Sequence, residues 1–356
     1  MKTYLVTGGA GFIGSNFIHH MINKYSEVKI INLDKLTYAG NLENLKDVEN
    51  SPNYTFIQGD ICDKELIEKL FSENEIDYVV NFAAESHVDR SIKEPEIFVK
   101  TNVLGTVNLL NVAKNSWEVQ GVFKQGKKFV QVSTDEVYGS LGETGYFLEN
   151  TPLDPHSPYS SSKAGADLMV KAYFDTYKMP VNTTRCSNNY GPYQFPEKLI
   201  PLLINNCLNH KNLPIYGNGM NIRDWLYVED HCSAIDIIIN SGRVGEIYNI
   251  GGHNERTNLQ IVKTIINYLN EKVDKKITEK LMTYVEDRKG HDKRYGIDPT
   301  KIKDELGWQP ETPFEVGIKN TIKWNLDNKE WMNNITTGEY ENYYNNMYEN
   351  QKNKTL

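Results

Sequence analysis

Apolar residues recur in a regular order along the first half of the chain. A short strand-like run at Thr3–Thr7 is followed by a glycine-rich turn and then by apolar residues at helical spacing between Phe12 and Met21. Strand-like runs with intervening segments return at Val28–Leu33, Tyr54–Gln58, Asp77–Phe82, Lys128–Val132 and Val181–Arg185. Strands that alternate with helices form parallel sheets covered by helices on both faces. The pattern therefore predicts an α/β fold built on a doubly wound parallel sheet.

Three glycines follow the first predicted strand, at Gly8, Gly11 and Gly14. In a strand–turn–helix unit they let the backbone approach a pyrophosphate, which the free N–H groups of the helix N-terminus bind. The second strand ends in Asp34, about 20 residues after Gly14, where a carboxylate can bond a ribose 2′-hydroxyl and would repel a 2′-phosphate. This spacing predicts a Rossmann-type site that holds NAD rather than NADP.

The regular alternation ends near residue 187. Helices are predicted over Glu229–Ile239 and Leu259–Leu269, with a strand over Glu246–Gly251 between them. We expect an NAD-binding Rossmann domain over 1–187, with its sheet completed by parts of 220–252, and a smaller C-terminal α/β substrate-binding domain over 188–335. Residues 336–356 are rich in Asn, Tyr, Glu and Lys, and we expect them to form an exposed tail.

A polar trio, Thr134, Asp135 and Glu136, follows the strand Lys128–Val132. Ligands bind at the carboxyl ends of strands in open parallel sheets. Two adjacent carboxylates there can act as acid and base on neighbouring atoms of one substrate, provided that their surroundings separate their pKa values. Taken alone, the trio fits a strand that ends in a solvated acidic turn equally well.

A helix start is predicted at Ser157 and Pro158, an N-cap followed by proline at the first helical position. Tyr159 and Lys163 then share one face of the helix. A tyrosine of pKa ~10 is a poor base at neutral pH, but a nearby ammonium group and a cationic nicotinamide favour its phenolate. The pair is a candidate for proton transfer, with an ordinary helix-surface pair as the alternative.

Other polar positions are open to two interpretations. Asp60 can face an adenine amino group or simply close a turn, and His87 alone is more typical of a structural hydrogen-bonding residue than of a catalyst. Lys198, Arg223 and Arg288 would suit a diphosphate-bearing substrate if they met in one cleft. Solvated surface charges are the alternative for each of these three.

Composition narrows the classes of function. The 356-residue chain has a net charge of -8, which argues against nucleic acid or an anionic membrane as its main partner. No apolar run approaches the ~20 residues of a membrane helix, and the N-terminus lacks a secretory pattern, so a cytoplasmic protein is expected. Its four cysteines have neither metal-ligand nor disulfide spacing, which predicts reduced thiols and no metal site.

With these residues in view, the chain resembles the extended short-chain dehydrogenase/reductase family, and within it the 4,6-dehydratases that act on dTDP-glucose. Tyr159 and Lys163, in the pattern Tyr-x-x-x-Lys, mark the superfamily together with the three glycines. The run Ser133–Gly139, STDEVYG, is far more specific. Further segments that match the family are Ala84–Ser91 and Asn188–Leu199. One departure is Lys289, where the family usually has proline.

The resemblance implies dTDP-glucose as substrate, NAD as cofactor and a homodimer. In the reaction it implies, Tyr159 takes the proton of the sugar's 4-hydroxyl, Thr134 bonds the same oxygen, and a hydride passes from carbon 4 to NAD. Glu136 then removes the proton on carbon 5 while Asp135, held protonated, protonates the departing 6-hydroxyl. Since the hydride returns to carbon 6, the cofactor ends as it began, and we expect it to be held tightly.

The resemblance also assigns binding residues. Those implied for the cofactor are Gly8, Gly11, Phe12, Ile13, Gly14, Asp34, Lys35, Thr37, Asp60, Ile61, Phe82, Ala83, Ala84, Ser86, Thr101, Tyr159, Lys163 and Asn189. Those implied for the substrate are Ser86, His87, Thr134, Asn188, Lys198, Leu199, Pro214, Tyr216, Arg223, Asn258, Arg288 and His291.

Two other functions compete with a dehydratase. A nucleotide-sugar 4-epimerase would use the same cofactor, tyrosine and lysine but needs no acid–base pair at carbons 5 and 6. A non-catalytic NAD-sensing protein would have no reason to retain Tyr159, Lys163 and Glu136 together. The sequence leaves the choice between thymidine and uridine diphosphate open.

Overall fold

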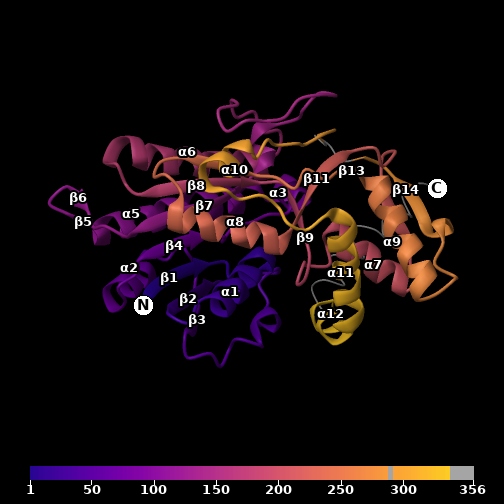
Figure 1. Cartoon of the computed structure of the whole chain (residues 1–356), viewed down its shortest axis with the longest axis horizontal. Coiled ribbons are helices and arrows are strands. Elements are labelled where there is room, and N and C mark those ends of the chain that lie inside the picture. The colour runs from indigo at the N-terminus through magenta and orange to yellow at the C-terminus, as the bar shows by residue number, and fades with distance from the viewer. Residues whose placement is uncertain (288–291, 337–356) are drawn as a thin grey trace.

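The computed structural model describes residues 1–287 and 292–336. Within them, a parallel sheet of seven strands forms the larger part of the molecule, in the order β12-β8-β7-β4-β1-β2-β3 (Figure 1). Its strands are β1 (Lys2–Thr7), β2 (Val28–Asp34), β3 (Tyr54–Gln58), β4 (Tyr78–Asn81), β7 (Lys128–Thr134), β8 (Val181–Cys186) and β12 (Ile247–Ile250). The strand order reverses beside β1, where β2 lies on one side and β4 on the other. This is the predicted doubly wound fold, and it sets a binding crevice at the carboxyl ends of the strands.

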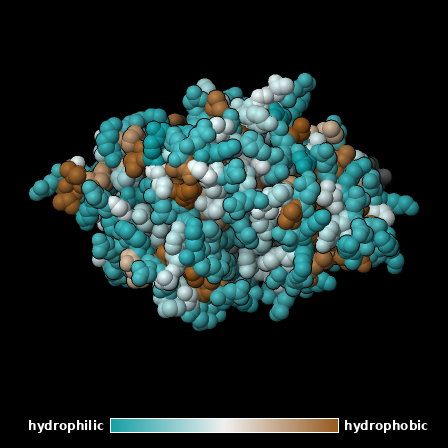
Figure 2. Space-filling view, viewed as in Figure 1, coloured by the Kyte–Doolittle hydropathy of each residue, from teal (hydrophilic) through white to brown (hydrophobic). Residues whose placement is uncertain are grey.

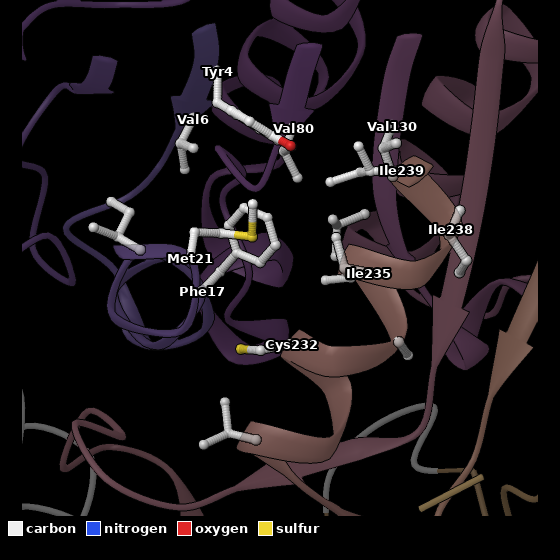
Figure 3. Packing of buried hydrophobic residues seen from close by; sticks show 14 of the residues in the cluster. Tyr4, Val6, Phe17, Met21, Val80, Val130, Cys232, Ile235, Ile238 and Ile239 are labelled. Carbon is white, nitrogen blue, oxygen red and sulfur yellow. The ribbon is translucent and has the colours of Figure 1, made fainter. Parts of the chain in front are cut away.

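Helices cover both faces of this sheet. The longer ones are α1 (Phe12–Lys24), α2 (Lys64–Glu73), α5 (Thr106–Trp117), α6 (Pro158–Tyr177) and α8 (Val228–Ser241). Figure 3 shows one face, where Phe17 and Met21 of α1 and Ile235 of α8 meet Val6 and Val80 of the sheet. Successive side chains of a strand point to opposite faces of the sheet. The side chains on the other face pack against α2, α5 and α6. Buried strands with apolar residues on both faces explain the near-continuous hydrophobic runs in the sequence.

One helix at the edge of the cleft is composite. It begins at Pro95 and ends at Trp117, and its middle is a π-helical segment, η2 (Val99–Gly105), between α4 (Pro95–Phe98) and α5. Such segments are frequent at functional sites. Shorter elements around the sheet are η1 (Leu42–Leu45), α3 (Val88–Lys93), β5 (Glu118–Val119), β6 (Val122–Phe123), η3 (Asp135–Tyr138) and α10 (Thr300–Leu306).

A second lobe lies at one end of the sheet and has its own core (Figure 1). In it, β9, β11 and β13 form one small sheet, and β10 pairs in parallel with β14. The lobe comprises β9 (Asn188–Tyr190), α7 (Leu199–Leu208), β10 (Leu213–Tyr216), β11 (Ile222–Tyr227), β13 (Glu255–Thr257), α9 (Asn258–Lys272), η4 (Glu279–Leu281), β14 (Met282–Val285), α11 (Phe314–Asp327) and α12 (Lys329–Ile335). Between β11 and β13 the chain returns to the large sheet through α8 and β12. The division at residue 187 stays a prediction.

The visible surface is mainly polar, with apolar residues in small separate groups (Figure 2). No helix in 1–287 or 292–336 is long and apolar enough to cross a bilayer. The predicted exposed tail, 336–356, lies outside the described residues except for Thr336.

Candidate active site

A cleft opens at the carboxyl ends of the parallel strands, on the side of the sheet that faces the second lobe. The turn after β1, the ends of β2, β3, β4 and β7, and the start of α6 all line it. Every residue that the sequence predicted for the cofactor lines this cleft. A single crevice thus gathers segments from residue 8 to residue 198 of the chain.

The glycine turn has no room for side chains. Gly8 has a φ of +68°, and a Cβ atom there would lie 2.6 Å from the backbone nitrogen of Ala83. A Cβ on Gly14 would lie 2.4 Å from the carbonyl oxygen of Gly8. Helix α1 begins directly after Gly11, and no side chain of the described residues caps it. Its first N–H groups therefore remain available to an anion such as a pyrophosphate.

Asp34 joins the glycine turn to the loop after β2. Its two carboxylate oxygens accept hydrogen bonds from the backbone N–H groups of Ala10, at 2.9 Å, and Leu36, at 2.8 Å. Burial raises the pKa of Asp34, and the two backbone bonds oppose that rise. Each carboxylate oxygen can accept a further bond, so this position suits a ribose hydroxyl.

Asp60 already has partners. Lys35 Nζ lies 2.9 Å from one of its oxygens, and the backbone N–H of Cys62 donates to the other at 2.9 Å. Both Asp60 and Lys35 line the cleft. The geometry fits the turn-closing interpretation of Asp60 and leaves its contact with adenine as a prediction.

The polar trio lies where β7 ends. Thr134 caps the short helix η3, because its hydroxyl oxygen accepts from the backbone N–H of Glu136 at 3.3 Å. The same hydroxyl donates to Asp135 Oδ1 at 3.3 Å. Asp135 is 2% exposed, whereas Glu136 is half-buried and lines the cleft beside it. The turn is therefore not solvated, and the simpler interpretation of the trio is wrong.

Burial separates the two carboxyl groups chemically. It raises the pKa of Asp135 well above its usual value, and the charges of Glu136 and Asp224 raise it further. Asp135 Oδ2 has no hydrogen-bond partner among the described residues. Burial and a neighbouring carboxylate both favour the protonated form of a carboxyl group. The environment of Asp135 therefore favours the form that a proton donor requires.

Tyr159 and Lys163 enter the cleft from the first turns of α6. A reciprocal capping box fixes the start of this helix: the backbone N–H of Ser160 donates to Ser157 Oγ at 3.0 Å, and that of Ser157 donates to Ser160 Oγ at 3.1 Å. Lys163 Nζ donates to the carbonyl oxygen of Val132 at 2.8 Å. The lysine thereby anchors the helix to β7, directly before the polar trio.

The pKa of Tyr159 is raised, whereas a base at this position requires a lowered one. Burial raises it well above the ordinary value, the charge of Glu136 adds to this, and only the hydrogen bond with Thr134 opposes it. Burial also lowers the pKa of Lys163. Positive charge from a bound nicotinamide is therefore needed to favour the phenolate.

Asn102 does not line the cleft, yet it positions two of its walls. It lies in η2 and is buried, and its side chain exchanges hydrogen bonds with the backbone of Glu85 at 2.8 and 3.0 Å. It also donates to Ser162 Oγ at 2.8 Å, which in turn donates to the carbonyl oxygen of Tyr159 at 2.7 Å. The π-helical turn therefore connects the loop after β4 to the helix of Tyr159.

Further residues of the cleft were not assigned a binding role individually, although some lie in the segments Ala84–Ser91 and Asn188–Leu199 that match the family. They are Leu33, Ala39, Gly40, Gly59, Glu85, Val132, Ser133, Cys186, Ser187, Gln194, Phe195 and Glu197. Several of these residues are sequence neighbours of predicted ones. A position next to a strand end is the one signal in the sequence that would have found them. Glu197 is 6% exposed and approaches His87 at 3.7 Å; its sequence neighbours do not reveal this burial.

The predicted substrate residues divide into two groups. Ser86, Thr134, Asn188 and Lys198 line the cleft, and Lys198 Nζ donates to the carbonyl oxygen of Ser86 at 3.2 Å. His87 is buried behind the wall, and Leu199 packs against the core of the second lobe. Those outside the lining of the cleft are His87, Leu199, Pro214, Tyr216, Arg223 and Asn258.

Arg223 nevertheless acts on the site through its charge. It lies on β11 and is buried, its guanidinium group is 4.3 Å from the ring centroid of Tyr295, and it donates to the carbonyl oxygen of Asp292 at 3.0 Å. Its charge opposes the rise in the pKa of Asp135. The predicted substrate residues Arg288 and His291 lie outside the described residues, directly before Asp292.

The Rossmann sheet, the uncapped helix after the glycine turn and the paired Tyr159 and Lys163 define a class: dinucleotide-binding enzymes of the extended short-chain dehydrogenase/reductase type. Within it, the chain belongs to the family described as GDP-mannose 4,6 dehydratase, whose model matches residues 5–321.

Curated relatives are more specific. A dTDP-glucose 4,6-dehydratase of Xanthomonas campestris is 51% identical over 344 residues, which cover 96% of this chain and 97% of that protein. The dTDP-glucose 4,6-dehydratase 1 of Escherichia coli K12 is 49% identical over 359 residues, covering 98% and 99%. The family resemblance stated from the motifs is confirmed.

Solved structures agree. The dTDP-glucose 4,6-dehydratase of Bacillus anthracis in complex with NAD is 52% identical, has a TM-score of 0.85, and is matched over 94% of this chain and 100% of that chain. A UDP-glucose 4-epimerase of Thermotoga maritima has a similar fold, with a TM-score of 0.81 over 91% and 99%, but only 29% identity. The epimerase fold is shared, whereas the sequence lies with the dehydratases.

Proposed function

We propose that this protein is a hydro-lyase that converts dTDP-glucose into dTDP-4-keto-6-deoxyglucose with NAD. The observation that carries the proposal is the pair Asp135 and Glu136, one carboxyl group buried with a raised pKa and the other facing the same cleft. The curated relatives at about half identity support the choice of reaction.

The cleft fits NAD. A Cβ would fill the space beside Gly8, the helix after Gly11 has no side-chain cap, and Asp34 closes the ribose end. When bound, NAD supplies a reversible two-electron acceptor for the hydride of carbon 4, which is later given to carbon 6. The NAD-bound structure of the Bacillus anthracis relative supports this cofactor.

Tyr159 and Thr134 act on the sugar's 4-hydroxyl. Tyr159 accepts its proton, and the hydroxyl of Thr134, held at the end of β7, bonds the same oxygen. Because burial raises the pKa of Tyr159 in the empty site, the phenolate has to be stabilised by positive charge that arrives with the ligands. The product of this step is a 4-ketone.

The ketone makes the hydrogen on carbon 5 acidic. Glu136 removes it as a proton, and Asp135 gives its own proton to the 6-hydroxyl, so that the carbon–oxygen bond breaks and water leaves. The proton that Glu136 holds returns to carbon 5 when carbon 6 is reduced. Atoms balance as one glucose moiety minus one water, and the cofactor is unchanged.

Lys198 and Arg223 are the residues that we assign to the substrate's diphosphate, together with Arg288. Lys198 lines the cleft, and Arg223 stands behind Tyr295 at the lobe side of the carboxyl pair. An ammonium group in the cleft of an acidic protein and a guanidinium group near its carboxyl pair suit two phosphates.

A homodimer is part of the proposal. Exposed apolar side chains lie on η2 and α6, two segments that pack against one another: Val99 is 51%, Leu104 58% and Leu168 55% exposed. Light scattering of Leu104→Glu and Leu168→Glu should show a monomer. Val316→Glu on α11, where Val316 is 50% exposed, is the matched control and should leave the mass unchanged.

The test of the reaction is mass spectrometry of the product. Purified protein incubated with dTDP-glucose and no added cofactor should yield a nucleotide sugar lighter by one water. A product of unchanged mass would favour the 4-epimerase, and absence of turnover on any nucleotide sugar despite bound NAD would favour a sensor. A continuing need for stoichiometric NAD would contradict the closed redox cycle.

A further inference from the structure

The last described helix, α12, packs against the cofactor half of the molecule through a group of apolar side chains. We call it the C-terminal aromatic cluster: Tyr193, Phe195, Trp324, Trp331, Met332 and Ile335. The rings of Trp324 and Trp331 are 4.8 Å apart, as are those of Tyr193 and Trp324. Phe195 also lines the cleft. One side of the cluster is therefore part of the site's wall.

A hydrogen bond connects this cluster to a helical turn near the start of the chain. The indole N–H of Trp331, a residue only 7% exposed, donates to Asn44 Oδ1 at 2.8 Å. Asn44 belongs to η1 and is 3% exposed. A second contact joins the same two elements, from Asn334 Nδ2 to Glu43 Oε2 at 3.2 Å. In Figure 1, α12 lies in the second lobe on the side that faces α1.

The connection continues from Asn44 into the dinucleotide site. Asn44 Nδ2 donates to the carbonyl oxygen of Ala10 at 2.9 Å, and the backbone N–H of Ala10 donates to Asp34 at 2.9 Å. Ala10 lies within the glycine turn. A chain of buried hydrogen bonds thus runs from the C-terminal helix through η1 to the turn and to the carboxylate at the ribose position.

Between Asp34 and η1 the backbone covers one end of the cleft. Thr37, Ala39 and Gly40 line it there, beyond Asp34. The backbone N–H of Asn41 also donates to the carbonyl oxygen of Ala10 at 3.0 Å. Segment 37–40 is therefore held at both ends, by Asp34 and by the turn that Asn44 and Trp331 fix. A dinucleotide that leaves past this segment has to displace it.

We propose that α12 is a strap that retains NAD, with Trp331 acting through Asn44 to hold segment 37–40 over the adenosine end of the cofactor. Trp331 is a positioning residue, since it does not line the cleft. The proposal rests on the proposed function only in requiring NAD and not in the choice of sugar. Retention suits a reaction whose cofactor ends each turnover unchanged, because a cofactor lost between turnovers would leave an idle enzyme.

The test compares two buried tryptophans whose indole N–H groups donate to different partners. Trp331→Phe keeps an aromatic ring and removes the indole N–H. Trp308→Phe is the matched control, because Trp308 is 6% exposed and its indole N–H donates to Ser233 Oγ at 2.9 Å, on α8 and away from the loop after β2. Each full-length protein is loaded with NADH, excess NAD is added, and the loss of bound NADH fluorescence gives the dissociation rate without any sugar present.

We expect NADH to leave Trp331→Phe roughly fivefold faster than the wild type, which is the change expected from one buried hydrogen bond, and to leave Trp308→Phe at the wild-type rate. Asn44→Asp, which keeps the acceptor for Trp331 but loses the donor to Ala10, should also release NADH faster. The double variant Trp331→Phe/Asn44→Asp should gain less than the product of the two effects, because both interrupt one chain.

Three results would overturn the strap. One is an unchanged rate in both Trp331→Phe and Asn44→Asp, another is an equal acceleration in Trp308→Phe, and the third is simple multiplication of the two effects in the double variant. Thermal unfolding of each variant, measured in parallel, identifies any variant that does not fold. If either Trp331→Phe or Asn44→Asp fails to fold, the NADH dissociation rate of the other one tests the proposal. Failure of the dehydratase proposal would appear separately, as wild-type protein that retains NADH but forms no dehydrated sugar.

Discussion

The cofactor half of the cleft and the second lobe differ in how well their binding residues could be predicted from the sequence. Every residue predicted for NAD lines the cleft, whereas Pro214, Tyr216, Arg223 and Asn258 of the second lobe do not. In the first half the predicted residues stand at or beside the carboxyl ends of parallel strands, which the local sequence pattern identifies. In the lobe the candidates sit on β10, β11 and the start of α9, and their convergence depends on tertiary packing that no local pattern encodes.

The largest expected effect falls where the two halves meet. Glu136→Gln should reduce dehydration by roughly 10²–10⁴-fold, the usual loss when a positioned proton-transfer group is removed, while oxidation at carbon 4 remains possible. Reduced cofactor should therefore accumulate transiently, seen by stopped-flow absorbance in the near ultraviolet.

Tyr159→Phe is the comparison variant for this measurement. It removes the base for the first step, so it should show neither product nor the transient absorbance. If both variants lost both signals equally, the division of roles between Tyr159 and Glu136 would be wrong, although the cleft would still bind NAD.

Gly8→Ala tests whether NAD binding depends on close approach of the backbone at the glycine turn. A side chain there meets both a φ of +68° and a contact of 2.6 Å with Ala83, so we expect a loss of about 2–4 kcal/mol in stability and a sharp fall in NAD bound per protein. Gly121→Ala is the control, because Gly121 has a φ of +80° but nothing within 4 Å of a Cβ. It should cost only about 1–2 kcal/mol and leave NAD binding intact. Urea unfolding and the NAD content of the purified proteins measure both; equal losses would show that crowding at Gly8 is unimportant.

The same difference explains which residues and contacts of the site could be predicted from the sequence. Gly8 and Asp34 were predictable because spacing within one strand–turn–helix unit determines where they lie. A protonated Asp135 was predicted from the chemistry that the family resemblance implied, but the physical causes that raise its pKa, burial and the charges of Glu136 and Asp224, are visible only in three dimensions. The bond from Trp331 to Asn44 joins residues 287 positions apart, and no periodicity or motif predicts such a contact.

Arg223→Gln tests whether the second lobe contributes to binding of the nucleotide sugar. If its guanidinium group serves the diphosphate, the KM for the nucleotide sugar should rise about tenfold, equivalent to about 1.4 kcal/mol, with a smaller change in kcat. Loss of this charge would raise the pKa of Asp135 further, which keeps that acid protonated and its role intact. Steady-state kinetics decide the matter, and a fall in kcat at unchanged KM would place Arg223 with the carboxyl pair rather than with the diphosphate.

The smallest effect expected is that of an ion pair between the two regions. His156, directly before the cap of α6, has Nδ1 2.7 Å from Asp292 Oδ1, and the hydrogen bond to Asp292 raises the pKa of His156, with Asp154 adding to it. A base whose pKa is raised on folding stabilises the protein fully below its unfolded value of ~6.5, and that contribution disappears as pH rises through the folded value. His156 is 41% exposed, so solvent screening limits the pair to about 0.2–1 kcal/mol. The free energy of unfolding in urea, measured from pH 6 upward to pH 9, should therefore fall slightly more in the wild type than in His156→Asn. Identical pH dependence in the two proteins would mean that this contact contributes nothing to holding the lobe against the helix of Tyr159.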